Sequence, residues 1–254
     1  MNNHITLTTI IIREVLRFSR IWLQTLLPPM VVTSLYFIIF GNLIGPCIGQ
    51  MDGFSYNEFI MPGLVMMAVI TNSYSNVVSS FYSSKFHRNI EEMLVSPMPN
   101  YIILLGYTLG GVARGLMVGV LVTVVALFFT DLKIEHPWIT ITIVFLTAML
   151  FSLGGFINAL FAKSFDDISI VPTFVLTPLT YLGGVFYSID MLSSFWRQVS
   201  LANPVLYMVN GFRYGILGTS DIDIATAIGL ILVMVVATFG VALLLMERGV
   251  GIRS

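Results

Sequence analysis

Six runs of this chain contain no Asp, Glu, Lys or Arg. They are residues 21–51, 59–84, 115–130 with an apolar stretch before it from Tyr101, 136–162, 168–189 and 224–246. About 20 helical residues, rising 1.5 Å each, cross a hydrocarbon core of roughly 30 Å, so each run can supply one crossing. The runs predict an all-α polytopic membrane protein with six transmembrane helices, near 23–44, 59–81, 104–129, 138–161, 169–188 and 224–246.

The composition supports this class and excludes others. The chain is 57% hydrophobic and 10% charged, whereas soluble domains carry about a quarter charged residues. The net charge of −1 gives no excess of positive charge, so we expect no nucleic-acid partner. Cys47 is a single cysteine and the three histidines are scattered, so we expect neither an internal disulfide nor a metal site. The first apolar run lacks a signal-peptide cleavage site, and we expect it to be retained.

The distribution of Lys and Arg predicts the orientation, because cytoplasmic segments carry more of them. If the N-terminus is cytoplasmic, eight basic residues lie inside: Arg13, Arg17, Arg20, Lys85, Arg88, Lys163, Arg248 and Arg253. Only three lie outside: Lys133, Arg197 and Arg213. Both termini are therefore predicted to be cytoplasmic.

Residues 1–22 have the pattern of an amphipathic helix. On a helical wheel, one narrow arc is apolar, with Ile11, Val15, Phe18 and Trp22. The opposite side is basic, with Arg13, Arg17 and Arg20. This pattern predicts an interfacial helix with its arginines over anionic lipid head groups, leading into the first span at Pro28-Pro29. The same charges also fit a simpler role, as a positive flank that orients the first span.

The third predicted span is rich in glycine at helical spacing. The glycines are Gly106, Gly110, Gly111, Gly115 and Gly119. Small residues four apart let another backbone approach closely, so this face predicts tight helix packing. The spacing leaves open whether the neighbour belongs to the same chain or to a second copy.

Residues 190–223 are mostly apolar but broken at Asn203-Pro204 and by glycines. The charge-free part is too short for a full crossing, so we expect short half-helices in a re-entrant or interfacial arrangement. The alternative is two further spans within this connection.

Arg114 is the one charge that this pattern places clearly inside a span. An intramembrane charge is a functional candidate, but the side chain can also snorkel to the inner interface or pair with a loop carboxylate.

Asp166 and Asp167 are two carboxylates next to each other in the short loop before the predicted fifth span. Adjacent residues do not share a helix face, so this pair does not indicate a catalytic site.

Two common energy sources are missing from the sequence. It contains no GxxxxGK[ST] phosphate loop and no series of acidic or histidine residues through the spans, as proton-coupled carriers usually have. Polar side chains gather in one span, between Thr71 and Ser80, instead of forming rings along a pore. If the chain is a pump, its motor is another chain.

The segment from Lys85 to Pro99 lies between the second and third predicted spans and has a helical pattern. Its apolar stripe is Phe86, Ile90, Met93 and Leu94, and the charged residues Lys85, Arg88, Glu91 and Glu92 lie largely off the stripe. Pro97 and Pro99 end the helix. The stripe fits two arrangements equally: packing on the protein's own bundle, or docking in a groove of a cytoplasmic partner.

Taken together, these features resemble the permeases of type 2 ABC exporters. The resemblance runs over essentially the whole chain, and its most specific stretches are NIEEMLVSPMP after the second span and NPVLYMVNGFRYGILG before the sixth. It implies a permease, not an enzyme, in a bacterial inner membrane: two copies form the pathway as a homodimer, and two separate ATP-binding-cassette subunits bind ATP and Mg. Residues 1–22 would be the connecting helix, 190–223 the outer re-entrant element, and spans two and five would line the pathway. The coupling helix to the ATPase would hold Phe86, Arg88, Ile90, Glu91, Glu92, Met93 and Leu94.

Two other classes remain open at this stage. One is a carrier or channel that needs no ATPase. The other is a membrane subunit that anchors or regulates another complex and moves no substrate.

Overall fold

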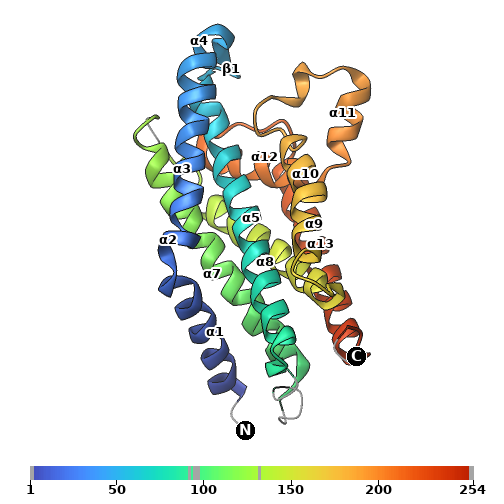
Figure 1. Cartoon of the computed structure of the whole chain (residues 1–254). Coiled ribbons are helices and arrows are strands. Elements are labelled where there is room, and N and C mark those ends of the chain that lie inside the picture. The colour runs from blue at the N-terminus through green and yellow to red at the C-terminus, as the bar shows by residue number, and fades with distance from the viewer. Residues whose placement is uncertain (1–2, 91–92, 94–97, 131–132, 252–254) are drawn as a thin grey trace.

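The computed structural model describes residues 3–90, 93, 98–130 and 133–251, and most of them are helical (Figure 1). The α-helices are α1 (Asn3–Arg20), α2 (Trp22–Thr25), α3 (Leu27–Tyr36), α4 (Gly45–Ile48), α5 (Tyr56–Phe86), α7 (Asn100–Ala126), α8 (Pro137–Phe161), α9 (Asp167–Val171), α10 (Thr177–Tyr181), α11 (Ser194–Leu201), α12 (Pro204–Leu217) and α13 (Ile224–Glu247). Two segments are π-helical, η1 (Phe37–Ile44) and η2 (Pro172–Leu176), and η3 (Ile189–Met191) is a 3₁₀ turn. Strands β1 (Gln50–Met51) and β2 (Phe54–Ser55) form a short antiparallel hairpin.

Among the residues that the structure describes, four helical stretches are long and apolar enough to cross a membrane. They are Trp22–Ile48, α7, α8 and α13. This agrees with an all-α polytopic membrane protein, and a count of six spans stays a prediction. The predicted fifth span, 169–188, is wrong at its C-terminal end, because the helical run that begins at Asp167 ends at Tyr181. The chain then turns, and Gly184 has a positive φ of 71° that a helix does not allow.

The first span is built from α2, α3, η1 and α4 in succession. Pro28 and Pro29 lie in the first turn of α3, where a missing N–H costs no hydrogen bond. Further along, the π-helical turns of η1 widen the helix, and Gly41 lies so close to Asn57 of α5 that a side chain there would collide with the Asn57 amide.

Helix α5 is the central element and packs against α7, α8 and α12. It begins with a capping box in which Ser55 and Glu58 satisfy each other's backbone N–H groups. The hairpin before it turns at Asp52-Gly53, where both residues have positive φ. At 31 residues, α5 extends past both ends of the predicted span 59–81.

The connection between residues 190 and 223 contains two short helices, α11 and α12, separated at Asn203-Pro204 as the sequence predicts. The Asn203 side chain accepts the N–H of Val205 and donates to the Leu179 carbonyl oxygen, so it fixes the start of α12 against the end of α10. Most of α12 is buried against α5 and α8. How this pair lies in a bilayer stays a prediction.

The start of α1 and the end of α13 lie at the same end of the molecule (Figure 1). The connection that follows Phe86 lies at this end too, whereas the β-hairpin and α11 lie at the opposite end. The bundle therefore has two distinct ends, one for each side of a membrane.

Candidate functional site

A line of polar side chains runs along one face of α5. Asn72, Asn76, Ser80 and Ser84 are spaced four residues apart, which places them one above another on the helix. They face α1, α2 and α3, and we call this junction the α1–α5 seam. Of the polar residues that the sequence concentrates in this span, Asn72, Asn76 and Ser80 are thus buried in the seam, whereas Thr71 is exposed.

At the α1 end of the seam, Glu14 lies between two arginines although it is only 1% exposed. It lies 3.4 Å from the Arg13 guanidinium and 3.3 Å from that of Arg17. Arg17 donates to the carbonyl and side-chain oxygens of Asn76, at 3.1 and 2.8 Å. Arg13 donates to the Tyr107 hydroxyl at 2.7 Å, and that hydroxyl donates to Ser84. Arg13 and Arg17 therefore bind protein groups, where the sequence predicts contact with lipid head groups.

The buried face of α1 is also different from the predicted one. It consists of Ile10, Glu14 and Phe18, so only Phe18 belongs to the predicted apolar arc. Trp22 lies beyond a break in the helix and is 54% exposed. This face of α1 packs against α7 because Gly106 and Gly110, which have no side chains, let Ile10 and Glu14 approach α7 very closely.

The remaining glycines of α7 pack within the same chain. Side chains of α5 and α8 fill the space beside them: Val77 and Ser152 at Gly111, Ser73 at Gly115 and Val69 at Gly119. The predicted close packing is present, and the neighbours that the sequence leaves open are α1, α5 and α8.

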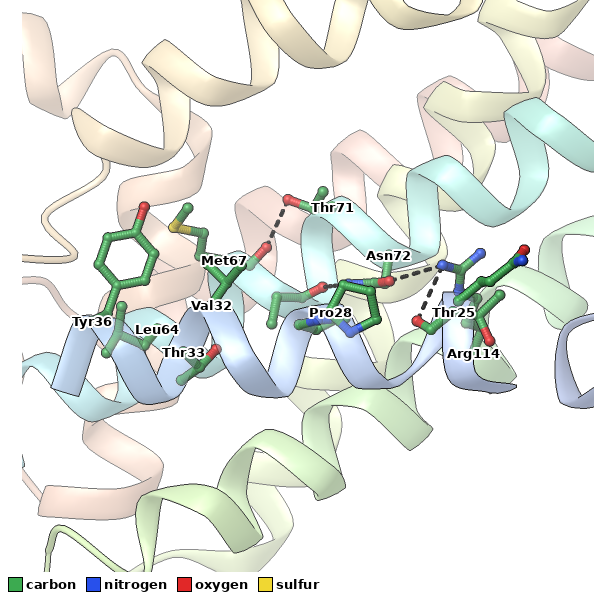
Figure 2. Close-up of a pocket in the computed structure, with 13 residues that line it drawn as sticks. Thr25, Pro28, Val32, Thr33, Tyr36, Leu64, Met67, Thr71, Asn72 and Arg114 are labelled. Carbon is green, nitrogen blue, oxygen red and sulfur yellow. Dashed lines mark hydrogen bonds between the residues drawn. The ribbon is translucent and has the colours of Figure 1, made fainter. Parts of the chain in front are cut away.

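Arg114 lies further along the seam, at one end of a cavity of about 280 Å³ between α3 and α5 (Figure 2). Its Nη2 donates to the Asn72 side-chain oxygen at 3.1 Å and to the Thr25 carbonyl oxygen at 3.4 Å. The cavity walls beyond it are mostly apolar, with Pro28, Val32 and Met67, and Tyr36 lies at the far end. Arg114 is thus inside the bundle, as predicted, and reaches an open cavity.

A second hollow, of about 520 Å³, lies at the α1 end of the seam. Its lining is polar and includes Arg13, Arg17, Arg20, Ser83 and Asn89. All three predicted head-group arginines thus border one recess, and Arg20 is exposed there.

Arg213 is a buried charge that the sequence analysis misses. It is 1% exposed, donates to the Gly184 carbonyl oxygen at 2.7 Å and to the Asn210 side chain at 3.3 Å, and its guanidinium carbon lies 4.0 Å from the centre of the Phe59 ring. The charge count assigns Arg213 to an outside segment, which stays a prediction, but it does not foresee that the side chain is buried among protein groups. The available signal was its position in an apolar stretch, NPVLYMVNGFRYGILG, at helical spacing from Asn210.

A family model described as ABC-2 type transporter matches residues 6–217, well over half of the 254 residues. The chain belongs to the ABC-2 type transporter family. It is 56% identical over 251 residues to the inner membrane transport permease YadH of Escherichia coli strain K12, and the match covers 98% of each chain. It is 22% identical over 237 residues to nodulation protein J of Neorhizobium galegae, covering 93% of this chain and 90% of that one. These findings confirm the resemblance seen in the sequence.

The family match covers α1, the whole seam and α12, so both buried arginines lie within the ABC-2 type region. The segment expected to couple this family to an ATPase starts differently from the prediction. Phe86 is the last residue of α5, and Arg88 has a positive φ of 60°, so no single helix runs from Lys85 onward. Lys85 donates to the carbonyl oxygens of Leu160 and Ala162 at the end of α8.

After this turn, Ile90 is 2% exposed and belongs to the bundle core, and Met93 packs against that core. Phe86 is 59% exposed, so it does not share a buried stripe with them. Glu91, Glu92 and Leu94 lie outside the described residues. Within the described part of the segment, the apolar residues that follow the turn face the protein's own bundle.

Proposed function

We propose that this chain is the transmembrane permease subunit of an ATP-binding-cassette exporter in a bacterial inner membrane. Two copies would form the pathway, and two separate ATPase subunits would bind ATP and Mg at the cytoplasmic face. The observation that carries the proposal is the ABC-2 type match over residues 6–217 in a sequence with no phosphate loop. A chain of this family without that loop needs an ATPase in trans. The name of the Escherichia coli relative, an inner membrane transport permease, supports the location and the activity.

The orientation follows from the charge count. The end that holds the start of α1, the end of α13 and the connection after Phe86 carries most of the Lys and Arg residues of the connections. Because Arg213 is buried, only Lys133 and Arg197 remain on the other side. The positive-inside rule therefore places both termini and the Lys85–Pro99 segment in the cytoplasm.

The Lys85–Pro99 segment is the proposed contact with the ATPase. Since Ile90 and Met93 face the bundle, they would hold the segment in place, while Arg88, Glu91 and Glu92 would meet the partner. ATP-driven closure of the two ATPases would then move the attached helices as rigid bodies, giving alternating access. Export is the direction that the family resemblance favours.

Co-purification with the ATPase tests this proposal. The candidate partner is a phosphate-loop chain encoded beside this one, produced together with a tagged permease. We expect the wild-type permease to retain the ATPase, and the double change Glu91→Lys and Glu92→Lys to reduce retention at least about tenfold, because two charges of the proposed interface are reversed. Glu247→Lys is the control, because Glu247 is an exposed carboxylate at the end of α13 on the same face.

Each outcome has a distinct meaning. If the double variant retains the ATPase as well as wild type does, the coupling role of these two carboxylates is wrong. If substrate still moves in cells that lack every candidate ATPase, the chain is a carrier or channel. If the wild-type chain binds an ATPase but moves nothing, it is an anchoring subunit.

A further inference from the structure

Among the described residues, no carboxylate forms an ion pair with Arg114. The ion pairs among the described residues are Arg13–Glu14, Arg17–Glu14 and Arg197–Asp190. The two acceptors of Arg114, Thr25 and Asn72, are neutral, and its Nε is buried without a hydrogen-bond partner in the described structure. An isolated charge in a low-dielectric interior is costly, and neutral acceptors do not cancel it.

The surroundings increase this excess of positive charge. The seam and the hollow at its α1 end hold Arg13, Arg17, Arg20 and Arg114 but only one described carboxylate, Glu14, so four positive charges face one negative charge. Glu14 lies against Arg13 and Arg17, and it forms no described ion pair with Arg114. Such a site attracts an anion.

The shape of the cavity indicates which kind of ligand would carry the anionic group. The arginine, Asn72 and Thr25 gather at one end, and the walls from there to Tyr36 come mostly from apolar side chains of α3 and α5, with Thr33 and Thr71 among them (Figure 2). Eleven residues separate Thr25 from Tyr36, which corresponds to ~16 Å of helix at about 1.5 Å per residue. The volume, about 280 Å³, is at the small end of ligand pockets, which span roughly 300–1,000 Å³. A head group with one apolar chain matches this space better than a bulky two-chain lipid.

We propose that the Arg114 cavity binds a single-chain amphiphile through its anionic group, a phosphate or a carboxylate. The planar guanidinium offers parallel N–H donors to such a group, and the amide nitrogen of Asn72 is held by the Ala68 carbonyl oxygen, which keeps the Asn72 oxygen toward Arg114. The apolar chain lies between Val32 of α3 and Met67 of α5. This inference deepens the proposed function, since it names a ligand class for the permease, but the binding step needs no ATPase.

Binding of radiolabelled dodecyl phosphate to the purified full chain, in phosphatidylcholine nanodiscs without any ATPase, tests the site. We expect saturable binding above that of empty discs, and at least a tenfold loss of affinity in Arg114→Gln. Arg114→Lys keeps the charge without the planar fork and is expected to retain part of the affinity. If Arg114→Gln is poorly folded, Arg114→Lys and the cavity variants below still decide the outcome.

The cavity part of the proposal has a matched pair of variants on α3. Val32→Trp fills the cavity, whereas Val31→Trp places the same side chain one residue away, outside the cavity lining. Both positions are about half exposed, so both variants are expected to fold. Val32→Trp should lower dodecyl phosphate binding and Val31→Trp should not. Equal binding by wild type, Arg114→Gln and Val32→Trp would overturn the proposal.

Competition distinguishes the sources of the anion. Unlabelled dodecyl phosphate should displace the label, and dodecanol and inorganic phosphate should not. Displacement by inorganic phosphate alone would mean that the site takes a free anion, and would overturn the amphiphile assignment. A single-chain lysophospholipid that co-purifies with wild type but not with Arg114→Gln would support the site with a resident lipid as its occupant, whereas a two-chain phospholipid with the same dependence on Arg114 would overturn the single-chain assignment. Failure of these tests leaves the ATPase experiment unaffected, because no ATPase is present.

Discussion

Arg213 and Arg114 both lie inside the helix bundle, but only Arg213 is enclosed by protein on all sides. Arg213 is almost fully buried, with the Gly184 carbonyl oxygen, the Asn210 side chain and the Phe59 ring around it. Arg114 is partly exposed and reaches a cavity. Both arginines have neutral hydrogen-bond acceptors and a buried Nε without a partner in the described structure, so the cavity is what distinguishes Arg114. The difference indicates that a buried arginine in this protein serves one of two purposes.

Arg213 connects parts of the chain that are distant in sequence. It lies on α12, its acceptor Gly184 lies in the turn after α10, and Phe59 lies at the start of α5. Asp221 extends the connection, since its N–H donates to Asn210 and its carboxylate accepts from Ser188 and Ile189. Arg213 therefore has a structural role, whereas the surroundings of Arg114 favour a ligand.

The largest expected loss of stability follows from replacing Arg213, the enclosed arginine. Arg213→Met removes a charged hydrogen bond and a cation–π contact, and we expect a loss of about 2–4 kcal/mol in stability. In a chain of this size, that lowers the midpoint of thermal unfolding in detergent by about 2–4 °C per kcal/mol. Arg197→Met is the matched control, because Arg197 forms an exposed ion pair with Asp190 in the same connection, and such pairs contribute little. Equal shifts in the two variants would refute the structural role of Arg213.

A smaller effect is expected at the acceptor of Arg213. Gly184 has φ of 71°, and a Cβ there would approach Leu206 to 2.9 Å, so Gly184→Ala strains the turn that presents its carbonyl oxygen. We expect a loss of about 1–2 kcal/mol in the same thermal assay. The control is Gly229→Ala in α13, where no atom lies within 4 Å of the added carbon and alanine favours the helix. A stabilised Gly184→Ala variant would show that the turn is not held rigidly.

The sequence predicted the apolar helices well and the charged positions poorly. The predicted span 138–161 agrees closely with α8, because a long apolar run without charges has one stable form in a bilayer. Charge counting did not reveal that Arg213 is buried, since it treats each Lys or Arg as aqueous, and the helical wheel of residues 1–22 did not single out Glu14, because neither method sees partners distant in the sequence. These charges are buried because specific neighbours accept them.

The candidate site, too, could be predicted only in part from the sequence. Glycine spacing on α7 indicated close packing, but the neighbours depend on tertiary structure. The helix expected from Lys85 onward failed because apolar periodicity does not reveal a backbone reversal such as the positive φ at Arg88. A functional role for Arg114 stays a prediction, and the cavity beside it depends on α3 and α5 together, which the sequence does not show.

Replacing Arg114, which borders the cavity, should cost less stability than replacing the enclosed Arg213. Arg114→Met gives up the hydrogen bond to Asn72 but also removes an uncompensated charge, so we expect a change in stability of less than about 1 kcal/mol without added ligand. The same thermal assay, repeated with dodecyl phosphate, should raise the midpoint of wild type and leave that of Arg114→Met unchanged. A loss as large as that of Arg213→Met would mean that Arg114 is a structural residue as well.

The smallest effect concerns Asp52, a carboxylate in the hairpin turn near Arg213. Burial, and then the charge of Asp221, raises the pKa of Asp52 above its usual value, although Arg213 opposes this shift. Because the folded state holds this proton more tightly than the unfolded state, stability falls as pH rises from the usual pKa through the raised one. At pH 7 the ionised carboxylate is therefore unfavourable, and Asp52→Asn should stabilise slightly, by less than about 0.5 kcal/mol. Asn also tolerates the positive φ of 50° at this position.

Asp223 provides the opposite case for comparison. It caps α13, and the hydrogen bonds from the backbone N–H and the side chain of Thr226 lower its pKa, so its contribution is present at neutral pH and lost as pH falls through the lowered pKa. Asp223→Ala should therefore destabilise at pH 7, and less so in acid. If Asp52 were instead the counter-charge that stabilises Arg213, Asp52→Asn would also destabilise at pH 7. Thermal midpoints of both variants at pH 7 and in acid thus decide whether the closed arginine depends on a carboxylate or only on the carbonyl, amide and ring that enclose it.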